Sequence, residues 1–209
     1  MKASEFDLRR DLRLDPHTGI TTFRHNRVMI FDANVFGLVR QELIEEIGTA
    51  RAKDFFLRLG FQLGYSDFLQ MKMLYRFDTE MDLLAAGMVI HAWQGLVQAT
   101  PREIRFDRET GDFLSTGVWN NSFEAQQHLC FNPPAKSPVC WTMMGYASGW
   151  CTAFFGNLLL AIEPVCVGQG ADHCEWRVMI PARWGRTADG YSKVYRDLLY
   201  GADDGRQAA

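Results

Sequence analysis

Three cysteines and one glutamate have the spacing expected of ligands for a single metal ion. Cys166 and Cys174 flank a glycine-containing loop between two apolar runs, so the two thiols can meet at facing strand ends. Glu163 lies three residues before Cys166 and can add a carboxylate oxygen. Cys140 falls in the first turn of an expected helix, where free amides and the helix dipole favour a thiolate. Four ligands rich in thiolate are typical of a closed, structural zinc site.

From the residues alone, the fourth ligand stays open. His173 competes with Glu163, because histidine is the commoner zinc ligand. The segment contains no paired Cys-x-x-Cys, so the competing interpretation is that these cysteines are small buried hydrophobic residues. That interpretation is the favoured one for Cys130 and Cys151.

A second candidate site is centred on His91, in a segment expected to be helical. Leu84, Met88, His91 and Gly95 share one helix face, on which the imidazole is the only polar side chain. The competing interpretation is a core histidine bonded to a backbone carbonyl. Trp119 follows a hairpin strand, and its indole N–H needs an acceptor when buried. Plain core packing is the competing interpretation for Trp119.

Composition excludes several classes of protein. Hydrophobic residues make up 47% of the 209 residues and charged residues 22%, as in ordinary globular domains. A net charge of -3 argues against contact with nucleic acid or an anionic membrane surface. No apolar run approaches the ~20 residues of a membrane span, and the first residues lack a signal-peptide core. We therefore expect a cytoplasmic protein whose five cysteines are ligands or buried thiols.

The elements that must position these residues follow no regular strand–helix alternation, so we expect an α+β fold of mixed helices and antiparallel strands. In order, the patterns predict a hairpin over 19–31, a helix from about 36 ended by Gly48, a helix ending near Gly64, a helix over 78–97, strands over 103–106 and 113–119, a helix from Ser137-Pro138 to Phe155, strands over 158–167 and 174–180, and an amphipathic helix over 191–200.

Several motifs carry a resemblance to a known family. SPVCWTMMGYASG at 137–149, AFFG at 153–156 and the CxGxGxDxC pattern at 166–174 resemble the 4-vinyl reductase segment of aromatic-sensing bacterial regulators. RAKDFFLRLGFQ at 51–62 resembles the XylR-type N-terminal segment of the same regulators. The resemblance covers about residues 14–185 and implies the sensor domain of a sigma-54-dependent transcriptional activator that responds to phenols.

The resemblance implies roles for particular residues. It implies that a structural Zn²⁺ is held by Cys140, Glu163, Cys166 and Cys174, which favours Glu163 over His173. It also implies that His91 and Trp119 bind the hydroxyl of a phenolic effector. The predicted ligand-binding residues are His91, Trp119, Leu84, Met88, Gly117, Tyr146, Trp150 and Ala161.

Three of those positions depart from the family pattern. Gly117 and Ala161 stand where bulkier side chains are expected, and Trp150 stands where tyrosine is usual. Because interiors are close-packed, the two small residues predict a roomier pocket, which Trp150 would partly refill. The expected effector is therefore a substituted or larger phenol.

The predicted organisation has three parts. Residues 1–48 form a hairpin and helix for homodimerisation, 49–185 form the sensing domain with the zinc site, and 186–209 form a linker helix and tail toward downstream AAA+ ATPase and DNA-binding modules. The alternative is a zinc-containing, vinyl-reductase-like enzyme. A closed zinc site and the absence of a nucleophile–base pair weigh against that alternative, so we expect no catalytic residues.

Overall fold

The structure is a computed structural model that describes residues 1–200, apart from the side chains of Asp197 and Tyr200. The helices are α1 Ala33–Ile47, α2 Thr49–Leu74, α3 Glu80–Trp93, α4 Phe123–Phe131, α5 Trp141–Phe155, α6 Pro181–Trp184 and α7 Ala188–Tyr200. The strands are β1 Leu12–Asp15, β2 Ile20–Phe23, β3 Asn26–Val28, β4 Gln98–Asp107, β5 Asp112–Asn120, β6 Leu160–Val165 and β7 Cys174–Met179. Short 3₁₀ turns lie at η1 Ala3–Glu5, η2 Leu8–Arg10, η3 Val167–Gln169 and η4 Gly185–Thr187.

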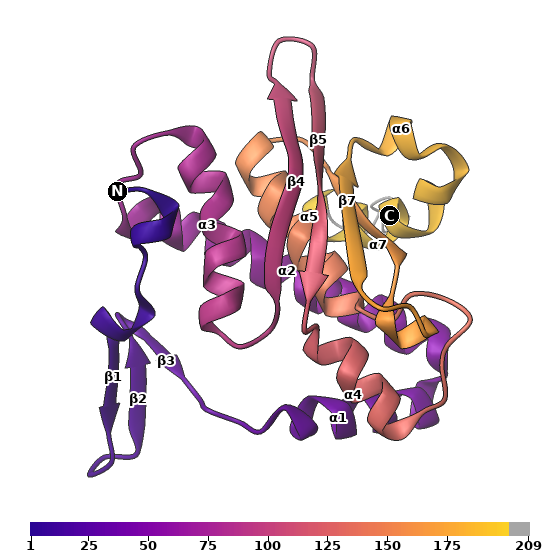
Figure 1. Cartoon of the computed structure of the whole chain (residues 1–209), viewed down its shortest axis with the longest axis horizontal. Helices are drawn as coiled ribbons and strands as arrows, with labels where there is room; N and C mark the ends of the chain where they lie inside the picture. The colour runs from indigo at the N-terminus through magenta and orange to yellow at the C-terminus, as the bar shows by residue number, and fades with distance from the viewer. Residues whose placement is uncertain (201–209) are drawn as a thin grey trace, which may run out of the picture.

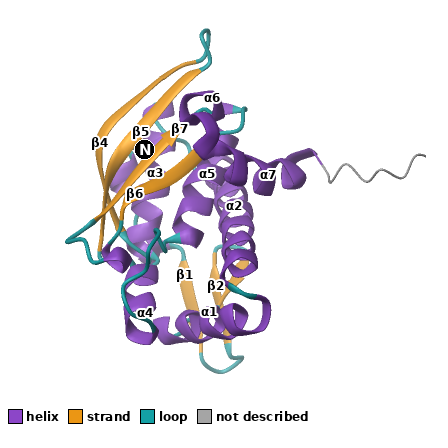
Figure 2. Ribbon diagram, turned by 90° about the vertical axis from the view of Figure 1, so that its right-hand side faces the viewer, coloured by secondary structure: helices purple, strands orange, loops and turns teal. Residues whose placement is uncertain are grey.

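The larger sheet has the order β4-β5-β7-β6, with every neighbouring pair antiparallel. Helices α3 and α5 cover one face of this sheet, and α2 packs on α5 (Figures 1 and 2). Along β5 the buried residues alternate, as expected of a strand with one face on a core. The inward residues Ser115 and Trp119 therefore point from the sheet toward the helices. The mixed helices and antiparallel strands confirm the predicted α+β class.

Helices α2 and α5 approach each other through four glycines. A Cβ built on Gly60 or Gly64 would lie 2.1 or 2.2 Å from a backbone oxygen of α5, and one on Gly145 or Gly149 would lie 2.3 or 2.0 Å from a backbone oxygen of α2. The prediction that the second helix ends near Gly64 is wrong, because α2 continues to Leu74. Gly64 serves close helix packing and not helix termination.

The N-terminal residues form a separate three-stranded sheet, β1-β2-β3, beside the main body (Figure 1). The predicted hairpin corresponds to β2 and β3, whereas β1 was not predicted. The amino group of Met1 forms an ion pair with Asp78 at 2.7 Å, which ties the start of the chain to the segment before α3.

The remaining differences from the predicted elements concern helix ends. The third helix, α3, is shorter than the predicted 78–97, and it starts after Thr79, whose side chain accepts a hydrogen bond from the Asp82 N–H at 3.0 Å. Helix α4 was not predicted. The terminal helix α7 begins at Ala188, and its Tyr195 ring is buried against Phe61 with centroids 4.7 Å apart.

Two further points concern the ends of the chain and membranes. The predicted tail over 201–209 lies outside the described residues. Within residues 1–200, no helix combines the length and the apolar character required to cross a bilayer.

Candidate functional site

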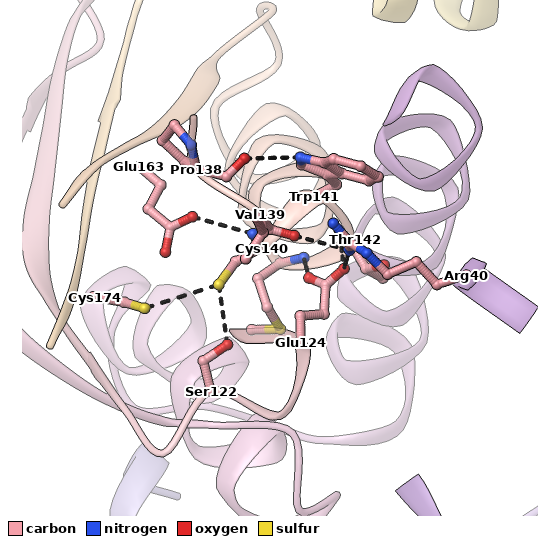
Figure 3. Close-up of polar contacts among 11 residues, drawn as sticks. Arg40, Ser122, Glu124, Pro138, Val139, Cys140, Trp141, Thr142, Glu163 and Cys174 are labelled. Carbon is pink, nitrogen blue, oxygen red and sulfur yellow. Dashed lines mark hydrogen bonds and ion pairs between the residues drawn. The ribbon is translucent and has the colours of Figure 1, made fainter. Parts of the chain in front are cut away.

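The four predicted metal ligands lie together in one buried cluster. Cys140 precedes α5, Glu163 belongs to β6, Cys166 follows β6 and Cys174 begins β7. One ligand atom from each residue lies within 4.8 Å of all the others. The cluster therefore joins the start of α5 to two neighbouring strands, as Figure 3 shows for three of its members.

The electrostatics of the cluster suit a divalent cation. Burial raises the pKa of the Cys140 thiol and raises that of Glu163 to about 8. Hydrogen bonds from neighbouring thiols hold the pKa of Cys166 below its ordinary value. Glu163 Oε2 accepts the Cys140 N–H at 3.1 Å, whereas its Oε1 is buried without a partner. A cation would satisfy that oxygen and compensate the charge of the thiolates, so the donor set fits a metal such as zinc.

The competing ligand His173 lies outside this cluster. Its ring contacts Asp172 and lies 3.1 Å from Glu175 Oε1, and its side chain is 33% exposed. Of the two leftover cysteines, Cys130 is exposed and Cys151 is buried. Glu163, and not His173, is therefore placed to complete the ligand set.

The start of α5 is set by a carboxylate from another helix. The prediction that this helix begins at Ser137-Pro138 is wrong, because α5 begins at Trp141 and Cys140 is its N-cap residue. Glu124 of α4 accepts hydrogen bonds from the Thr142 and Met143 N–H groups, each at 2.9 Å (Figure 3). Those amides would otherwise be unsatisfied at a buried helix end.

Arg40 connects α1 to the same region. Its guanidinium donates to the Val139 carbonyl at 2.9 Å, lies 3.5 Å from Glu124 Oε1 and sits 3.6 Å over the Trp141 ring (Figure 3). Both Arg40 and Glu124 are buried. A buried charge pair with these added hydrogen bonds fixes α1, α4 and α5 relative to one another.

A cavity of about 50 Å³ lies between the inner face of the sheet and helices α3 and α5. Six of the eight predicted ligand-binding residues line it: Leu84, Met88, His91, Trp119, Tyr146 and Trp150. The other lining residues are Gly87, Ala99, Ile104, Ser115, Ala147, Cys151, Trp176 and Val178. The walls are thus largely aromatic and aliphatic.

His91 is the lining residue with an unsatisfied polar atom. Its Nε2 is buried without a hydrogen-bond partner, and burial lowers the pKa of the imidazole to about 3. The ring lies against Tyr146, with centroids 4.0 Å apart. The Tyr146 hydroxyl donates to Asp67 Oδ2 at 2.9 Å, and burial raises the pKa of Asp67. A neutral imidazole in an apolar cavity can accept or donate one hydrogen bond to a small guest.

Two residues predicted for the pocket do not line the cavity. A Cβ built on Gly117 would lie 2.2 Å from the Trp176 ring, so that indole already occupies the space beside the glycine. Ala161 is fully buried in β6, where its N–H donates to Ser148 Oγ at 2.8 Å. The expectation that these two small residues open the cavity is therefore wrong.

Comparisons with known proteins match these features. Residues 7–107 match the XylR_N family, described as an activator of aromatic catabolism, and residues 119–180 match the 4-vinyl reductase domain. This chain belongs to the family of XylR-type aromatic-sensing domains. The resemblance drawn from its motifs is thereby confirmed.

Two curated relatives of the family are each 32% identical to this chain over 168 residues. They are the phenol regulator MopR of Acinetobacter guillouiae and the transcriptional regulatory protein XylR of Pseudomonas putida. Each match covers 80% of this chain but only 30% of the relative. The phenol-responsive sensory domain of the transcription activator PoxR, solved with phenol, superposes with a TM-score of 0.82 at 29% identity, covering 90% of this chain and 93% of that one.

Several residues around the two sites of this XylR-type domain were missed from the sequence. Asp67 carries a detectable signal, because it shares the buried face of α2 with Gly64 and Met71. Glu124 and Trp176 carry none, since their roles depend on the start of α5 and on the space beside a glycine of another strand.

Proposed function

We propose that this chain is the effector-binding sensory domain of a transcriptional activator and that its effector is a phenol. The observation that carries the proposal is the apolar cavity in which the buried His91 Nε2 has no partner. MopR is named a phenol regulator, and the PoxR sensory domain was solved with phenol. This chain is similar to both.

The indole groups of the cavity favour Trp119 as the second polar contact. Trp150 donates its N–H to the Leu84 carbonyl at 3.0 Å, and Trp176 donates to Ser115 Oγ at 3.2 Å. In the described part of the chain, Trp119 makes no such bond and lines the cavity. We therefore assign its N–H to the effector oxygen and His91 to the effector proton, with the ring between apolar walls.

The size of the cavity links binding to movement. Its volume of about 50 Å³ is below the ~150 Å³ that holds benzene in an engineered apolar cavity. A single aromatic ring therefore requires lining side chains of α3 or α5 to move outward. Such a ligand-dependent shift between two arrangements is what a sensor transmits. The proposed effector is accordingly a small monocyclic phenol.

We propose that Cys140, Glu163, Cys166 and Cys174 hold a structural zinc ion. The partnerless Glu163 oxygen and the three converging thiols support this assignment. Zinc would join the N-terminal end of α5 to β6 and β7. A closed set of four protein ligands leaves no open position for substrate, so we propose a binding function and not vinyl-reductase-like catalysis.

We further propose that residues 1–48 mediate homodimerisation. The segment between β3 and α1 exposes 69% of Met29, 71% of Ile30 and 54% of Phe31, and α1 exposes Leu38 and Val39. A contiguous apolar surface of this kind is rare on a monomer, and a second copy of the chain would cover it.

Residues 186–209 are proposed to lead to AAA+ ATPase and DNA-binding modules. The chain spans about a third of the length of its curated relatives, which leaves room for such modules in a longer protein. We place the protein in the cytoplasm, where cysteines remain reduced; the sensing domain would occupy residues 49–185.

Calorimetric titration with phenol tests the central proposal. The unmodified protein should bind phenol, and His91→Ala should lose most of that affinity while keeping its zinc. His17→Ala, at an exposed site, is the matched control and should bind as the unmodified protein does. Absence of phenol binding, or loss of zinc from His91→Ala, would contradict the assignment. Recovery of chemically altered phenol would support the enzyme alternative.

A further inference from the structure

The cavity offers hydrogen-bond partners to an aromatic hydroxyl but no positive charge. It is lined from α3, β4, β5, α5 and β7, and no lysine or arginine is among the lining residues. The titratable lining groups are His91 from α3 and Tyr146 and Cys151 from α5, whereas the three strands contribute none.

Each titratable group that faces the cavity is uncharged near neutral pH. Burial lowers the pKa of His91 to about 3, so its imidazole is neutral. Burial raises the pKa of Cys151 to about 12 and raises that of Tyr146 well above its ordinary value. Behind Tyr146 lies Asp67 of α2, whose Oδ2 is 2.9 Å from the tyrosine hydroxyl. The ionisable group directly behind the cavity wall is therefore a carboxyl, which can supply only negative charge.

We propose, on the basis of the function proposed above, that the site binds phenols only in their un-ionised form and rejects phenolates and aromatic carboxylates. An anion entering this cavity gives up its hydration and meets no compensating cation. A phenolate also has no proton to donate to His91 Nε2, which is buried and without a protein partner. Binding would then leave that nitrogen unsatisfied beside a buried charge.

The proposal sets a specific pH dependence for each ligand. Only the neutral fraction of a phenol is competent to bind, so the apparent Kd rises about tenfold for each pH unit above the ligand's own pKa. His91 does not titrate near neutral pH and adds no opposing change in that range. Affinity therefore depends on the acidity of the ligand and not on that of the protein.

The test compares two phenols of similar size by calorimetry at about pH 6 and about pH 9. An alkylphenol ionises near ~10, as tyrosine does, and should bind with nearly equal Kd at both values. A nitrophenol ionises close to neutral pH, and its Kd should rise about 100-fold once the pH exceeds its pKa by about two units. Benzoate should not bind at either pH, whereas benzyl alcohol should. Circular dichroism at both values checks that the protein stays folded.

The outcomes separate this inference from the proposed function. If the nitrophenol binds equally well or more tightly at about pH 9, or if benzoate binds as well as benzyl alcohol, the inference is overturned while phenol sensing stands. If neither phenol binds at about pH 6, the proposed function itself fails, and this inference fails with it.

Discussion

Replacing Gly149 by alanine tests the contact between α2 and α5, which supports one wall of the cavity. A Cβ at this position would lie 2.0 Å from the Phe61 carbonyl oxygen and 2.8 Å from its carbonyl carbon. An ordinary C···O contact is no closer than ~3.3 Å. Because the obstructing atoms are backbone, no side-chain rotation relieves the clash, and the helices must separate or bend.

The expected cost follows from two opposing effects. Overpacking a closed interface costs ~1–3 kcal/mol, and a backbone clash lies at the upper end of that range. Alanine recovers about 1 kcal/mol relative to glycine through its higher helix propensity. The net destabilisation is about 2 kcal/mol, which for a chain of this length corresponds to a fall in Tm of about 4–8 °C.

Gly190→Ala in α7 is the matched control. No atom lies within 4 Å of a Cβ built on Gly190, so only the propensity effect remains, and the variant should gain ~0.4–1 kcal/mol. Urea unfolding and thermal melts measure both variants. The reasoning is refuted if Gly149→Ala is as stable as the unmodified protein or is stabilised as Gly190→Ala is. A shift of α5 should also weaken phenol binding, because Trp150 and Cys151 follow directly and line the cavity.

Three further predictions concern single side chains. Cys166→Ser should lose about one equivalent of zinc by atomic absorption and melt at a lower temperature, whereas Cys130→Ser, at an exposed site, should change neither. The folded-state pKa of His91 is about 3, against 6.5 for a free imidazole, so below pH 6.5 only the unfolded chain takes up that proton. As the pH is lowered between these values, the free energy of unfolding should fall by about 1.4 kcal/mol per pH unit, and urea titrations of His91→Gln should show a shallower slope. Tyr195 is buried and its hydroxyl has no partner, so in guanidinium unfolding Tyr195→Phe should stay within ~1 kcal/mol of the unmodified protein while Tyr195→Ala costs ~3–5 kcal/mol.

The ligand set of the candidate metal site was accessible from the residues. Thiols and carboxylates are scarce, and strand ends joined by a short glycine-containing loop are forced to lie close together. Cys166 and Cys174 could therefore be paired from their spacing. The choice of Glu163 over His173 needed the family resemblance, and the structure agrees with it because the side chain of His173 lies among Asp172 and Glu175 instead.

Helix boundaries were less accessible wherever a distant group decides them. α5 begins at Trp141 because Glu124, from a helix that was itself not predicted, accepts the N–H groups of Thr142 and Met143. α2 passes through Gly64 because that glycine faces the α5 backbone. In both cases the local residue pattern is compatible with a different end, and a tertiary contact overrides it.

The sequence by itself determined the α+β class, the family, the four candidate metal ligands and six of the residues that line the cavity. These follow from periodicity, from the scarcity of metal-binding side chains and from motifs that are continuous in the chain. Only the tertiary structure decided the volume and charge of the cavity, the filling of the Gly117 gap by Trp176 and the carboxyl of Asp67 behind Tyr146. Volume and electrostatic environment arise from side chains that converge from five separate elements, and no local pattern encodes how closely those elements pack.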